Sequence, residues 1–194
     1  LINPKKGAYA AFQKAISYGF VERNSKKIEA LSKFIITYPK NELLDDALFE
    51  LASAYNREEE NEKAIATYDK LITIFQTSPF LAKSSLNKGL ILYNLEKYDL
   101  AKSTLQKVAI KYNKYAVGEQ AVRTLKEIAI DQGNVSSFVQ WTKDQNLDTF
   151  TDVELEKTTF TAAERRFLEG NINSALKLFE EYFEVYPQGS FSKV

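Results

Sequence analysis

The sequence repeats at an interval of 37 residues, and this period limits the possible fold more than any other feature. Ala64 and Ala101 occupy equivalent places in the phrases NEKAIATYDKLI and YDLAKSTLQKV, 37 positions apart, and Ala175 follows 74 positions later. Pro39 and Pro187, in the similar phrases ITYPKNEL and EVYPQGSF, are separated by four such intervals. A fixed period of roughly 20–50 residues is typical of a linear array whose units pack on their neighbours. We therefore expect a repeat protein.

Each unit is predicted to be a pair of antiparallel α-helices. In the second unit, apolar residues recur at helical spacing over 47–55 and over 64–75, and the polar stretch 57–61 separates the two runs. The predicted fold class is all-α, a single solenoid of about five helical hairpins over residues 1–194. The five units fall near 8–44, 45–81, 82–118, 119–155 and 156–192.

The pattern resembles the tetratricopeptide repeat (TPR) family. In that family a small residue lies midway along the first helix, an alanine lies near the start of the second, and a proline ends it. The second unit matches this pattern with Ala52, Tyr55, Ala64 and Tyr68. The resemblance implies a right-handed superhelix of hairpins whose concave groove binds a protein or peptide segment.

A narrower resemblance concerns the cellular setting. The long period and phrases such as DDALFELASAY are similar to long envelope TPR proteins of bacteria, in particular of Bacteroidetes. This resemblance implies a scaffold in the periplasm or associated with the outer membrane.

No apolar run in the sequence approaches the ~18 residues that span a bilayer. Because the chain contains no Met and begins at Leu1, we expect it to be part of a longer repeat array.

The composition argues against several classes of function. Lys plus Arg equals Asp plus Glu at 26 each, so the chain lacks the basic excess with which proteins bind nucleic acid. It contains neither Cys nor His, which removes the thiolate nucleophile, the commonest metal ligand and the commonest general base. We therefore expect no enzyme, no cofactor and no metal site.

The partner-binding residues are expected on the first helix of each unit, because these helices line the concave face in the family that the sequence resembles. Several candidates are apolar, which favours a hydrophobic stripe on the ligand over a purely ionic one. A residue in this set could instead belong to the hairpin core, since one helical step separates the two faces. The groove candidates are Phe12, Ile16, Phe49, Ser53, Lys83, Asn87, Leu90, Arg123, Glu127, Phe160 and Glu164.

The fourth unit departs from the pattern. Lys126 stands at the small position, Phe138 at the alanine position, and the single tryptophan, Trp141, in the second helix, while Gly133 is expected to end the first. Local rules often fail at functional or strained sites. The sequence thus predicts a kink or a pocket near Phe138 and Trp141, or alternatively a large aromatic residue that fills an irregular hairpin.

The last helix is predicted to expose an apolar face that contains Leu176, Phe179 and Phe183. In a solenoid such a face stacks on the next repeat, so we expect it to pair with another copy or with a further repeat.

Three hypotheses of function follow for the whole chain. It is an interaction scaffold with an occupied groove, a structural spacer in a longer chain, or, least favoured, an enzyme or small-molecule sensor.

Overall fold

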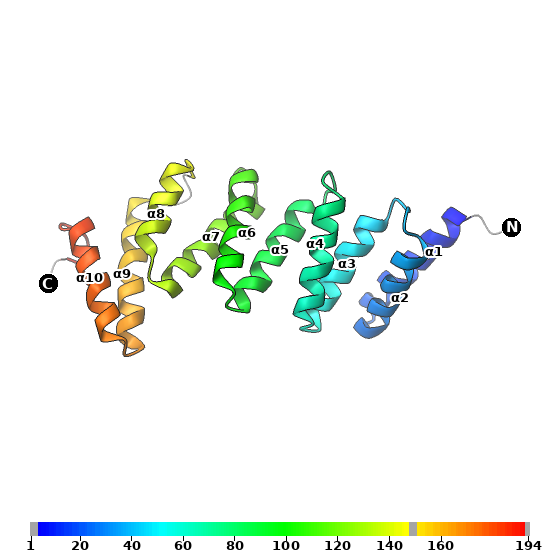
Figure 1. Ribbon diagram of the computed structural model, residues 1–194, viewed down its shortest axis with the longest axis horizontal. Helices are drawn as coiled ribbons and strands as arrows, with labels where there is room; N and C mark the ends of the chain where they lie inside the picture. The colour runs from blue at the N-terminus through cyan, green and yellow to red at the C-terminus, as the bar shows by residue number, and fades with distance from the viewer. Residues whose placement is uncertain (1–3, 148–150, 193–194) are drawn as a thin grey trace. The chain divides into compact units, whose positions relative to one another are not determined.

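A computed structural model describes residues 4–147 and 151–192. Within these ranges the chain forms ten α-helices and no strands (Figure 1). They follow one another as α1 (Pro4–Phe20), α2 (Asn24–Thr37), α3 (Leu44–Arg57), α4 (Asn61–Ile74), α5 (Leu81–Asn94), α6 (Tyr98–Lys111), α7 (Ala116–Gln132), α8 (Val135–Asp144), α9 (Asp152–Leu168) and α10 (Ile172–Val185). In the described part of the chain, no helix has the length and hydrophobicity needed to cross a membrane.

The 37-residue period of the sequence is also the period of the backbone. The second helix of each pair begins at one of five residues spaced 37 apart: Asn24, Asn61, Tyr98, Val135 and Ile172. The all-α class and the repeated helix pairs are therefore confirmed.

In the turn between the two helices of each pair, one residue adopts the left-handed backbone conformation, and this turn sets where the second helix begins. The residues with positive φ in these turns are Glu22, Glu59, Glu96, Gly133 and Gly170, again 37 apart. Each turn is closed by a backbone bond of the kind that ends helices in a Schellman motif; Glu60 N–H, for example, donates to the Tyr55 carbonyl at 2.9 Å. Gly133 ends α7 at φ 65°, as the sequence predicts.

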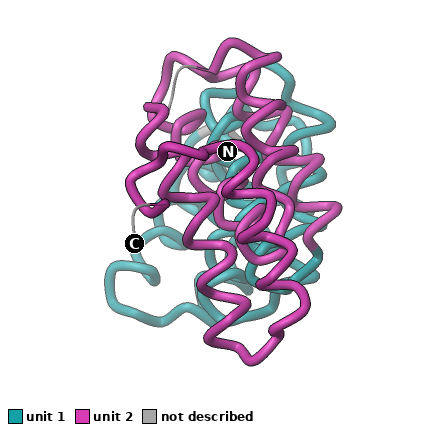
Figure 2. The backbone as a smooth tube through the Cα atoms, turned by 90° about the vertical axis from the view of Figure 1, so that its left-hand side faces the viewer, with its two compact units in different colours: residues 1–97 teal, residues 98–194 magenta. Residues whose placement is uncertain are grey.

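The chain divides into two compact units, Leu1–Lys97 and Tyr98–Val194, coloured separately in Figure 2. In unit 1, α1 packs on α2, α2 on α3, α3 on α4, and α4 on α5. Two hydrophobic clusters fill it, one around Leu31 and Phe34 and one around Tyr68 and Leu71, and Tyr55 contacts both. The single solenoid expected over the whole chain stays a prediction.

Unit 2 contains the irregular repeat. Helix α8 has 10 residues, whereas α6 and α10 have 14 each. Helix α7 contacts α6, α8 and α9, and α9 also packs against α8 and α10. The short α8 lets α7 and α9 approach each other directly, so the departure predicted for the fourth unit corresponds to a changed helix arrangement.

An exception in the first unit also has a structural role. Lys27 stands where other units carry alanine, yet its side chain is only 9% exposed. Its ammonium group lies 2.5 Å from a carboxylate oxygen of Glu50 on α3. Gly19 leaves room for the lysine stem, because a Cβ there would lie 3.1 Å from Lys27 Cδ. The exception is therefore a partly buried ion pair that joins α2 to the following helix pair.

Candidate functional site

Unit 1 carries a groove with a volume of about 450 Å³ between α3 and α5, with α4 beneath it. Its walls come from the C-terminal halves of the two first helices, and its apolar floor from Leu90 and Ile91. The lining residues are Ser53, Asn56, Arg57, Tyr68, Asn87, Leu90, Ile91 and Asn94. A groove of this size with few charges is suited to binding rather than to proton transfer.

Tyr68 organises the polar wall of the groove. The residue belongs to α4 and is 1% exposed, and its hydroxyl group reaches between α3 and α5. It lies 3.1 Å from Ser53 Oγ, and it accepts a hydrogen bond of 3.0 Å from Asn87 Nδ2. Burial raises the pKa of Tyr68 above its ordinary value, so the phenol is neutral near pH 7. The Ser53 and Asn87 side chains are thereby held in fixed positions.

The rim of the groove is positively charged at one end. Arg57 and Asn94 are the last residues of α3 and α5, and they occupy the same position of the repeat. The guanidinium of Arg57 is exposed and takes part in none of the ion pairs among the described residues. Lys83, on the first turn of α5, lies with Nζ 6.0 Å from the ring centroid of Phe49. Lys83 therefore lies at the opposite end of α5 from Asn94 and is not among the residues that line the groove, so the positive charge of the groove lining comes from Arg57.

Three of the predicted groove residues, Ser53, Asn87 and Leu90, line this groove. Phe49 is only 8% exposed and stacks on Phe80, with ring centroids 4.8 Å apart. Phe12 is 8% exposed and belongs to the neighbouring hydrophobic cluster, against which Ile16 also packs. None of these three residues is among those that line the groove, and their role in binding stays a prediction.

Sequence reasoning missed Asn56, Arg57, Tyr68, Ile91 and Asn94. A signal was present for Arg57 and Asn94, because polar residues recur at the end of two first helices 37 positions apart. No comparable signal marked Tyr68, which lies on a second helix and resembles any other aromatic core residue.

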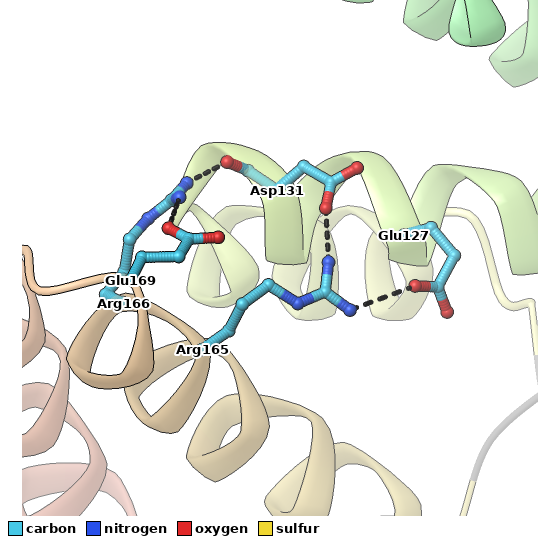
Figure 3. A network of polar contacts seen from close by, with 5 residues as sticks. All are labelled: Glu127, Asp131, Arg165, Arg166 and Glu169. Carbon is cyan, nitrogen blue, oxygen red and sulfur yellow. Dashed lines mark hydrogen bonds and ion pairs between the residues drawn. The ribbon is translucent and has the colours of Figure 1, made fainter.

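The corresponding face of unit 2 is crossed by ion pairs (Figure 3). Arg165 of α9 lies between two carboxylates of α7, 3.6 Å from Glu127 and paired with Asp131. Arg166 binds Glu169 at 2.7 Å and donates to the Asp131 carbonyl at the end of α7, where a cation is favourable. The predicted groove residue Glu127 is therefore engaged in holding two helices together.

The remaining candidates of unit 2 do not gather in one groove. Arg123 is exposed and lies 3.9 Å from Glu119 of its own helix, and Glu164 is exposed. Phe160 is half-buried and stacks on Phe191, with ring centroids 4.4 Å apart. Phe138 and Trp141, by contrast, come together at a second, smaller cavity.

The predicted apolar face of α10 is partly exposed. Leu176 and Phe183 are 57% and 48% exposed. Phe179 is half-buried, because its ring packs against Phe160 at a centroid distance of 5.7 Å. The three residues follow one another at spacings of three and four, which places them on one side of the helix.

Helix pairs at a fixed period, with small residues at the helix crossings, define a helical-repeat protein. Sequence profiles of the tetratricopeptide repeat match residues 46–78 and 82–109. These two helix pairs are therefore tetratricopeptide repeats, and the chain as a whole is similar to proteins of that family. Comparison with curated protein sequences gave no match.

Solved structures show the same fold. A tetratricopeptide repeat protein from Parabacteroides merdae is 14% identical, with a TM-score of 0.66 over 94% of this chain and 68% of that chain. MamA from Desulfovibrio magneticus is 14% identical, with a TM-score of 0.61 over 98% of this chain and 99% of that chain. The TPR-like repeats of a putative kinesin light chain from Podosopora anserina are 14% identical, with a TM-score of 0.57 over 98% of this chain and 100% of that chain. Proteins of this repeat family serve in general as protein–protein interaction scaffolds and are typically not catalysts, so the expected partner is a protein.

Proposed function

We propose that the groove between α3 and α5 binds an extended peptide segment of a protein partner, and that the chain acts without catalysis. The observation that carries this proposal is the lining of the groove, where side-chain amides and a hydroxyl stand above an apolar floor. Asn side chains both donate and accept, so they can pair with the N–H and C=O groups of an extended backbone. The volume of about 450 Å³ falls in the range of ligand sites.

The charges in the groove indicate the composition of the segment. Leu90 and Ile91 offer an apolar surface to one side chain of the peptide. Arg57 offers a cation without an ion-pair partner among the described residues. A segment with an apolar side chain followed by a carboxylate therefore fits best.

Replacing Leu90 with glutamate is expected to weaken peptide binding at least tenfold, because the carboxylate removes the apolar floor and repels the acidic ligand. Binding of a randomised peptide library to the purified chain, followed by titration of the enriched peptides, measures this effect. Arg57→Gln is expected to reduce the preference for acidic peptides while leaving the apolar preference intact.

Ile74→Glu is the matched control for this experiment. Ile74 is 55% exposed on α4 and does not line the groove, so the same change of charge leaves the binding surface unaltered. Equal affinity of the wild-type protein and the Leu90→Glu variant would contradict groove binding. It would favour a structural spacer instead, a role that the ion-paired α7 and α9 of unit 2 also fit.

For the apolar face of α10, we propose pairing with a second copy of the chain. Exposed apolar residues clustered on one side of a helix are typical of an association surface. The Leu176→Asp/Phe183→Asp double variant is expected to abolish concentration-dependent association in sedimentation equilibrium. Ile36→Asp, at an 80% exposed position of α2, is the control. A wild-type mass that stays at 22.1 kDa at every concentration would contradict the pairing.

The bacterial envelope setting implied by the resemblance also stays a prediction. A selected peptide whose sequence matches a segment of a bacterial envelope protein would support it. Peptide binding in the groove depends on the lining residues and not on that setting.

A further inference from the structure

A second cavity lies in unit 2, between the second helices α6 and α8 and above α7. Its volume is about 160 Å³. The floor consists of buried Leu125, Ile128 and Ala129, and Phe138 and Trp141 form one wall. Lys102, Gln106, Asn134 and Ser137 complete the lining. The cavity is separate from the groove of unit 1 and shares no residue with it.

The sequence explains why a cavity forms at this place. Phe138 occupies the position of Ala64, Ala101 and Ala175, where a small side chain lets two helices cross closely. A phenylalanine at such a position requires wider spacing of the helices. Trp141 occupies the position of Thr67 and Thr104, and its half-buried indole stands beside the resulting space. The ring centroids of Phe138 and Trp141 lie 6.3 Å apart.

The volume limits what the cavity can hold. Drug-sized ligands occupy pockets of roughly 300–1,000 Å³, and this cavity is well below that range. An apolar cavity of about 150 Å³ accepts one benzene ring. The size therefore fits a single aromatic or leucine side chain, which is the way in which a protein partner anchors itself in a pocket.

The mouth of the cavity carries an uncompensated positive charge. The equivalent residues in other units are Ile28, Ile65, Val139 and Leu176, so the lysine at position 102 is peculiar to this repeat. No carboxylate lines the cavity, and Lys102 takes part in none of the ion pairs between residues that the structure describes. An acidic group beside the inserted side chain would be favoured there.

We propose that this cavity is an anchor site for a protein segment that inserts one aromatic or leucine side chain beside Trp141 and places an adjacent carboxylate on Lys102. The site gives the scaffold a second point of attachment, on its second helices.

The test uses the Leu90→Glu variant, in which the groove of unit 1 is disabled. Peptides selected on this protein from a random heptamer library are expected to contain an aromatic residue or leucine next to Asp or Glu. Trp141 is the only tryptophan of the chain, so its fluorescence reports binding at this cavity directly. Titration with the selected peptides is expected to give a saturable change in emission.

Two variants decide the outcome. Ser137→Phe blocks the cavity from its exposed side, and Lys102→Glu reverses the charge at the mouth; each is expected to raise the dissociation constant at least tenfold. Lys107→Glu is the matched control, because Lys107 is exposed on α6 and lies outside the cavity. This variant is expected to change the dissociation constant less than twofold. Selected peptides that bind both cavity variants with unchanged affinity, or that leave Trp141 emission unaltered, would overturn the proposal.

Discussion

Replacing Phe34 with alanine is expected to lower the free energy of unfolding by about 3–5 kcal/mol, the range found when a buried aromatic side chain is truncated. Phe34 is 1% exposed in unit 1, and its ring centroid lies 5.7 Å from that of Phe12 and 5.2 Å from that of Tyr38. The truncation removes contacts within α1 and α2 and leaves a cavity that the surrounding helices fill only in part. Chemical denaturation followed by far-ultraviolet circular dichroism measures the effect.

Ile36→Ala provides the matched control for Phe34→Ala. The two residues lie two positions apart on α2, but Ile36 is 80% exposed. Surface substitutions of this kind usually change stability by about 0.5 kcal/mol or less. Equal destabilisation by the two variants would show that Phe34 does not occupy the core of unit 1.

Replacing Glu50 with alanine is expected to destabilise the protein by about 3 kcal/mol, because it leaves the ammonium group of Lys27 buried without its partner. The Lys27 side chain is 9% exposed and that of Glu50 is 34% exposed. The partial exposure of Glu50 places the expected cost at the lower end of the range for a broken buried pair. The same denaturation experiment measures it.

The double variant Lys27→Ala/Glu50→Ala tests whether the loss of stability in Glu50→Ala comes from the charge of Lys27 that has lost its partner. It restores the alanine that Ala64, Ala101 and Ala175 supply in other units, and it removes both charges together. Its stability is expected to lie within about 1 kcal/mol of the wild-type value, since replacing a whole buried pair is often neutral. A double variant as unstable as Glu50→Ala alone would exclude the stranded-charge explanation.

Part of the candidate groove could be predicted because it depends on helical phase alone. Ser53 and Leu90 lie on first helices at positions that the 37-residue register places on one face, and both line the groove. Phe49 has the same phase but lies beneath the surface, stacked on Phe80. One helical step separates a groove position from a core position, and the distance to the neighbouring helix decides between them. That distance is not encoded in periodicity.

Tyr68 illustrates a contact that no local pattern reveals. It lies on a second helix, and its side chain passes between two first helices to bind Ser53 and Asn87. The three residues are separated by 15 and 19 positions in the chain, so only packing brings them together. The ion-pair partners of Lys27 and Arg165 could not be predicted for the same reason. Each partner lies on the helix pair next to that of the basic residue.

The sequence by itself determined the repeat period, the all-helical class, the resemblance to the tetratricopeptide repeat and the departure of the fourth unit. These features follow from local interactions: apolar spacing along each helix, small residues at crossings, and turns such as that at Gly133. Only the tertiary structure decided which side chains form the groove, which charges are paired, and that the aromatic residues Phe138 and Trp141 border a cavity of about 160 Å³. Those outcomes depend on the distances between helices, because burial, ion pairing and cavity volume all change with separations of a few ångströms.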